Sequence, residues 1–115
     1  MDDILYVQKS SELMDKQVLG LITYLDHEEN VVKIVEVYGL VKEANENTVI
    51  VEGEVWQQEE GDDEMDVSYA SDFSLPFDTE NYWQAEGGEY KLILSGQHVP
   101  NPDFLTQWRV HPPKN

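Results

Sequence analysis

Two neighbouring stretches of alternating, valine-rich sequence constrain the fold of this chain most. Residues 31–42 and residues 48–57 both favour strands, and a short polar segment, 44–47, separates them. In the second stretch, small or apolar residues at odd positions alternate with mostly polar or charged ones, as in a strand with one buried face. We therefore predict that the two stretches pair as a β-hairpin. Gly39 interrupts the first stretch, where glycine commonly marks a bulge or a sharp bend.

Further strands are expected at residues 66–75 and 90–95, where apolar side chains alternate with others, and at residues 105–110, between a proline-containing loop and the prolines that end the chain's pattern. In the first of these, Val67, Tyr69, Phe73 and Leu75 are predicted to share the buried face. Asp78 is a good helix cap, and residues 79–85 are expected to form a two-turn helix that ends at the following glycines. The predicted fold class is mainly β: one domain over residues 1–115, a small β-barrel or sandwich of five to six antiparallel strands with one or two short helices.

Residues 11–25 fit two structures. The apolar residues Met14, Val18, Leu21, Ile22 and Leu25 have the spacing of a helix face. Residues 18–25 also fit a strand, and a glycine in the middle costs a helix about 1 kcal/mol relative to alanine. We favour the strand, and the helix stays open as the alternative.

Composition limits the possible chemistry. The chain has 115 residues, of which 40% are apolar, and this length is typical of one domain with its own core. Cysteine is absent, which excludes disulfides, thiolate metal sites and a cysteine nucleophile. The sequence has neither the start of a secretory signal nor an apolar stretch near the roughly 20 residues that span a bilayer. The expected location is the cytoplasm, and no membrane association is expected.

Charge is distributed very unevenly. Residues 43–90 contain fifteen carboxylates and no lysine or arginine, in a chain whose net charge is -17. Such a surface repels nucleic-acid phosphates and anionic lipids and attracts cationic partners. We therefore expect no direct binding to nucleic acid. A general role in solubility explains the acidity about as well.

No catalytic or metal-binding motif is present. The histidines, His27, His98 and His111, have no HxH or HExxH spacing, and the acidic segment 59–64 lacks the spacing of a calcium loop. The chain also lacks a GxSxG elbow and any phosphate-binding glycine motif. We predict no catalytic residues, no bound metal and no cofactor.

Aromatic residues lie among the acids, which is the composition of a protein-binding surface with a charged rim. Glu52 and Glu54 are expected on one face of a strand, about 6.7 Å apart. Trp56, Tyr82 and Trp83 are the expected surface aromatics, whereas Tyr69 and Phe73 are expected to be buried. The predicted contact region comprises Glu52, Glu54, Trp56, Glu59, Glu60, Asp62, Asp63, Glu64, Asp66 and Trp83.

The predicted function is therefore that of a non-enzymatic acidic protein-binding module. It would be an inhibitor, an immunity-type protein or a regulator that docks on a basic surface of another protein. One alternative is a small-ligand-binding or enzymatic β-barrel, which requires a cavity with a strongly shifted titratable group. Another is an acidic accessory domain with no partner that recognises its charge. The sequence leaves the oligomeric state open.

Overall fold

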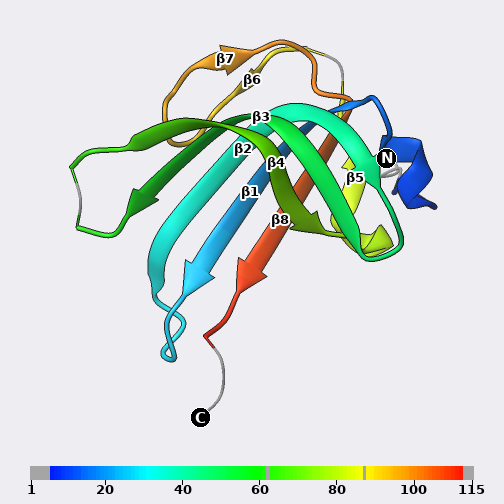
Figure 1. Cartoon of the computed structure of the whole chain (residues 1–115). Coiled ribbons are helices and arrows are strands. Elements are labelled where there is room, and N and C mark those ends of the chain that lie inside the picture. The colour runs from blue at the N-terminus through cyan, green and yellow to red at the C-terminus, as the bar shows by residue number, and fades with distance from the viewer. Residues whose placement is uncertain (1–5, 62, 87, 113–115) are drawn as a thin grey trace.

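The computed structural model describes residues 6–61, 63–86 and 88–112, and these residues form a mainly β structure (Figure 1). A six-stranded sheet has the order β4-β3-β2-β1-β8-β5, and a two-stranded sheet pairs β6 with β7. Two 3-10 turns accompany them. The elements are η1 (Ser10–Leu13), β1 (Gln17–Leu25), β2 (Val31–Ala44), β3 (Thr48–Glu59), β4 (Asp66–Pro76), η2 (Thr79–Asn81), β5 (Tyr82–Gln84), β6 (Tyr90–Lys91), β7 (His98–Val99) and β8 (Phe104–Val110).

The predicted central hairpin is confirmed, since β2 and β3 pair in antiparallel register. Asn45 closes its turn: the side-chain oxygen accepts hydrogen bonds from the N–H groups of Asn47 and Thr48, each at 2.9 Å. Gly39 lies directly opposite Gly53. A Cβ on either glycine would overlap the backbone of the opposite strand, so only glycine allows the strands to approach this closely where the sheet bends.

Residues 17–25 form a strand and not a helix, which settles the alternative left open by the sequence. β1 lies in the interior of the sheet, antiparallel to β2 and parallel to β8. The β1–β8 pairing joins distant parts of the chain: the Gln17 N–H donates to Asp103 Oδ2 at 2.9 Å, and the Asp103 N–H donates to the Gln17 carbonyl at 2.8 Å. This parallel pair departs from the all-antiparallel arrangement predicted.

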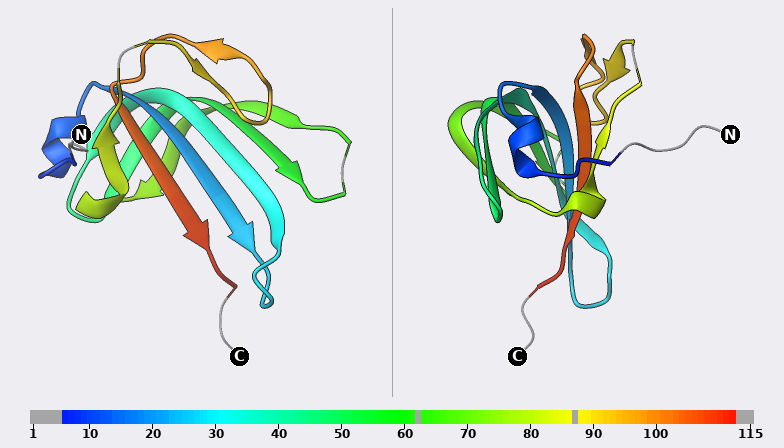
Figure 2. Two further views of the ribbon diagram at one scale, coloured as in Figure 1. Left: turned by 180° about the vertical axis from the view of Figure 1, so that it is seen from behind. Right: turned by 90° about the vertical axis from the view of Figure 1, so that its right-hand side faces the viewer.

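The large sheet curls around its inner face, as the edge-on view in Figure 2 shows. The main core fills this inner face with Val7, Leu13, Val18, Ile22, Val35, Val37, Val41, Val49, Val51, Val55, Leu75 and Tyr82. Among the described residues β4 and β5 remain the two edges of the sheet. The sheet is therefore open, and the predicted barrel or sandwich is not confirmed.

A smaller core lies on the outer face, where the β6–β7 segment covers the bend of the sheet (Figure 1, top). Trp56, Leu92 and Val99 are its buried residues. Glu36 joins the segment to the sheet. Glu36 is only 3% exposed. Its carboxylate accepts hydrogen bonds from the N–H groups of Ile93, at 3.0 Å, and Leu94, at 3.1 Å.

Two predicted elements are wrong in detail. Residues 79–85 do not form a two-turn helix: Asp78 does cap a turn, accepting from the Glu80 N–H at 2.9 Å, but η2 spans only Thr79–Asn81. The chain then extends as β5 because Tyr82 enters the main core and pairs with Thr106 of β8. The strand predicted over residues 90–95 is only Tyr90–Lys91, followed by a turn.

The predicted face of β4 is also wrong. Val51 pairs with Phe73 and Gly53 with Ala70, so two residues of β4 lie opposite one residue of β3. This bulge reverses the alternation between its two sides. Phe73 packs against the main core, while Tyr69 lies on the outer face and is 66% exposed. None of the described helical turns is long or apolar enough to cross a membrane.

Candidate partner-binding groove

A surface groove of about 330 Å³ lies on the outer face of β2, β3 and β4. We call it the acidic-aromatic groove. It contains Glu52 and Glu54, the two carboxylates predicted to share a strand face, and its walls include exposed apolar and aromatic side chains. Its lining consists of Gln17, Tyr38, Gly39, Leu40, Glu52, Gly53, Glu54, Trp56, Tyr69, Gln97 and Val99.

A row of three cross-strand neighbours crosses this groove. Tyr38 on β2 pairs with Glu54 on β3, and Glu54 pairs with Tyr69 on β4. Neighbouring strands are about 4.8 Å apart, so the glutamate lies between two tyrosines on the same face. The Glu54 side chain is exposed, and its carboxylate makes no hydrogen bond or ion pair with any described residue. The row thus presents an unpaired carboxylate flanked by aromatic rings.

The two tyrosines are held in different ways. The Tyr38 hydroxyl donates to the Pro100 carbonyl at 2.9 Å, and burial, together with the Asp103 carboxylate, raises the pKa of Tyr38 above 10.0. The Tyr69 phenol donates a hydrogen bond to Glu52, and this bond is the main reason that the pKa of Tyr69 is also raised. Glu52 also lies 3.9 Å from Lys42 Nζ. Glu54 is therefore the carboxylate with more freedom to bind a new cation.

The structure separates the two tryptophans predicted as surface contacts. Trp56 is only 2% exposed and lies beneath the β6–β7 segment, so it supports the groove from below and its indole offers almost no surface. Trp83 lies on β5, at the opposite edge of the sheet from β4. It is half-buried and lines a different, smaller hollow with Leu19, Leu21 and Leu105. The predicted contact residues therefore do not form one patch.

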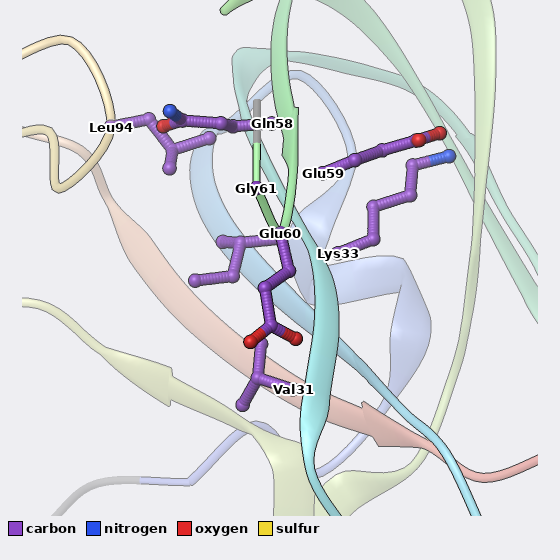
Figure 3. A pocket seen from close by; sticks show the side chains of 8 residues that line it. Val31, Lys33, Gln58, Glu59, Glu60, Gly61 and Leu94 are labelled. Atoms are coloured by element: carbon purple, nitrogen blue, oxygen red, sulfur yellow. The ribbon is translucent and has the colours of Figure 1, made fainter. Parts of the chain in front are cut away.

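The acids from the end of β3 to the start of β4 form a second part of the acidic surface. Glu59, Glu60, Asp63, Glu64 and Asp66 are all exposed, whereas Asp62 lies outside the described residues. Glu59 and Glu60 border a pocket of about 310 Å³ with Val31, Ile34 and Leu94 (Figure 3). In Figure 3 the Glu59 side chain lies alongside Lys33, its register partner on β2, and Glu60 extends over Val31.

Tyr38, Leu40 and Tyr69 are groove residues that the sequence prediction missed. Tyr38 and Leu40 alternate with Val37 and Val41, so both faces of this strand are apolar and the alternation does not distinguish the core face from the groove face. Tyr69 was assigned to the wrong face because the bulge at residues 71–72 leaves no recognisable mark in the sequence. The pairing of the strands identifies these residues: Leu40 lies opposite Glu52, and Tyr38 and Tyr69 lie on either side of Glu54.

No group of three His, Asp or Glu side chains among the described residues is arranged to hold a metal ion. His98 Nδ1 lies 3.6 Å from Glu89 and His111 Nε2 lies 3.7 Å from Glu29, and both pairs are exposed.

Comparisons with known proteins found no similar protein: no family model, no curated protein and no solved structure matches the chain.

Proposed function

We propose that this chain is a non-enzymatic protein-binding module that docks on a basic surface of another protein through the acidic-aromatic groove. The observation that carries the proposal is the Tyr38–Glu54–Tyr69 row, with an exposed carboxylate between two aromatic rings. A lysine or arginine side chain can make two favourable interactions at such a site: an ion pair with the carboxylate and a cation–π contact with an aromatic face. The partner would be a protein with a cationic surface that this chain inhibits or regulates.

The remaining acids support this proposal through long-range attraction. Glu59, Glu60, Asp63, Glu64 and Asp66 are exposed around the end of the β3–β4 hairpin. Charges of one sign gathered on one side of a protein raise the rate at which an oppositely charged partner associates, and salt screens this effect. These acids would steer the partner, while the groove would hold it.

The small-ligand or enzymatic alternative has weaker support. Of the described tyrosines with a raised pKa, Tyr38 and Tyr69 line the groove, and a raised pKa makes a phenol a poorer acid near neutral pH. Tyr82 has the larger shift, but it lies within the main core and lines none of the described pockets. If the chain is instead an acidic accessory domain, no single acid should contribute more to binding than another. The following experiment tests this alternative.

The test is an NMR titration of the ¹⁵N-labelled protein with a flexible basic peptide, acetylated and amidated Gly-Arg-Gly-Arg-Gly. We expect shifts concentrated in residues 38–40, 52–54 and 67–69, and weaker binding as salt rises. Glu54→Gln should weaken binding about two- to fivefold, the range for one exposed ion pair. The matched control is Glu46→Gln, which removes the same charge from an exposed residue in the β2–β3 turn. Equal weakening by both variants would mean that only net charge matters, and the groove proposal would be wrong.

A further inference from the structure

The outer edge of β4 is the feature that extends the proposed function. β4 spans Asp66–Pro76 and pairs only with β3 among the described residues, so its other edge has no partner. Every second N–H and C=O along an edge strand points away from the sheet and can pair with an added strand. Proteins usually block such edges with bulges, prolines or lysines.

Only one half of this edge is blocked. Beyond Ala70 the strand contains the bulge, Lys42 Nζ donates to the Ser71 carbonyl at 3.3 Å, and Pro76 ends the strand. Residues 66–70 pair with β3 in unbroken register, from Gln57 opposite Asp66 to Gly53 opposite Ala70. They contain no proline, lysine or bulge. We call residues 66–70 the edge segment.

Apolar side chains in the edge segment are unusually exposed. Val67 is 56% exposed and Tyr69 is 66% exposed, and both lie on the outer face beside Trp56 and Glu54. Tyr69 also lines the acidic-aromatic groove. The free backbone edge and the groove are therefore adjoining parts of one surface.

We propose that the partner binds as an extended strand added to the edge segment, with lysine or arginine at alternate positions. This inference rests on the proposed function and specifies its binding mode. An added strand would lie about 9.6 Å from β3, two strand spacings away. A long basic side chain pointing to the outer face would cross the Tyr69 ring and meet the Glu54 carboxylate. Backbone hydrogen bonds would supply affinity, and the groove would select the charge.

Charge excludes the other obvious occupant, a second copy of this chain. Pairing two edge segments in parallel register would place Asp66 opposite Asp66, and in either direction it would join two molecules that each carry a net charge of -17. Like charges opposite each other on paired strands are destabilising. A cationic strand gains from the same carboxylates, so the acids both protect the edge from self-association and select its partner.

The test uses three synthetic peptides with the sequence Val-Lys-Val-Lys-Val-Lys-Val, acetylated and amidated. One is unmodified, one is N-methylated at the valines between lysines, and one is N-methylated at the lysines. The two modified peptides keep every charge, and each loses N–H donors from one edge only. We expect one modified peptide to bind at least about fivefold more weakly than the other, because only one edge of the added strand faces β4. We also expect slowed amide exchange within residues 66–70 in the complex.

The outcomes separate the two proposals. If both modified peptides bind as well as the unmodified one, strand addition is wrong, while docking through Glu54 stands. If the Val-Lys peptide fails to bind although the Gly-Arg peptide binds in a Glu54-dependent way, the strand mode is likewise overturned alone. If the same peptide with glutamate in place of lysine binds equally well, the charge selection is refuted.

Discussion

Glu36 offers the sharpest test of how the outer core is held. Its carboxylate is buried, and both oxygens accept backbone N–H groups, those of Ile93 and Leu94. The perturbation is Glu36→Gln, which keeps the size of the side chain. The amide oxygen can retain one hydrogen bond, but the amide nitrogen then faces an N–H group that has lost its acceptor.

The expected cost follows from these two bonds. A hydrogen bond to a charged group contributes about 1.5–3 kcal/mol, and a buried donor without an acceptor costs a similar amount. Losing one of the two bonds should therefore lower the free energy of unfolding by about 2–3 kcal/mol. This is a large part of the roughly 5–15 kcal/mol that stabilises a typical domain. The corresponding fall in Tm is roughly 10 °C for a chain of this size.

Urea unfolding followed by tryptophan fluorescence measures the global change, and amide exchange at Ile93 and Leu94 measures the local one. Glu54→Gln is the matched control, because it removes the same charge from an exposed position on the same face of the sheet and should change stability by no more than about 0.5 kcal/mol. If Glu36→Gln leaves the urea midpoint and both exchange rates equal to those of the control, the carboxylate does not anchor the segment.

Two further predictions concern the main sheet. Gly53→Ala should cost about 3 kcal/mol or more in urea unfolding, because its Cβ would overlap the opposite backbone, whereas Gly20→Ala should cost less, since its Cβ would meet the side chains of Thr106 and Val37 at 3.1 Å. Equal costs would contradict the close approach at the bend. Burial raises the pKa of Tyr82 above 10.0, so its contribution to stability is fully present below pH 10 and is lost as the pH rises further. In Tyr82→Phe, the free energy of unfolding should fall less as the pH rises above 10, as measured by urea unfolding at a series of pH values. A pH dependence equal to that of the unsubstituted protein would contradict this prediction.

The parts of the fold that were predicted correctly depend on local pattern. Valines at alternate positions, with an Asn-rich segment between them, define β2 and β3 because a strand repeats every two residues and a turn needs particular side chains. The errors concern long-range pairing. β5 is a strand because Tyr82 finds a place beside Thr106 in the core, and nothing within residues 79–85 specifies that contact.

The candidate site was predicted only in part for the same reason. Glu52 and Glu54 do share the outer face, as their spacing requires. Trp56 lies on the same face, and the alternation alone predicts that it is exposed to solvent. It is buried because a segment some forty residues further along the chain, held by Glu36, covers it. Burial on one side of a strand depends on what packs there, which alternation cannot specify.

The pairing of β1 with β8 has a consequence for how the chain acquires its structure during synthesis. β1 lies inside the finished sheet, yet one of its neighbours is made only after β2 to β7 have been completed. Until then an acid-free strand has an unsatisfied edge, and such edges promote association between incomplete chains. Contacts between residues so distant in sequence also slow folding. The nascent protein should therefore be most prone to aggregate just before residues 104–110 leave the ribosome, and its excess of negative charge would help to keep it dispersed during that interval.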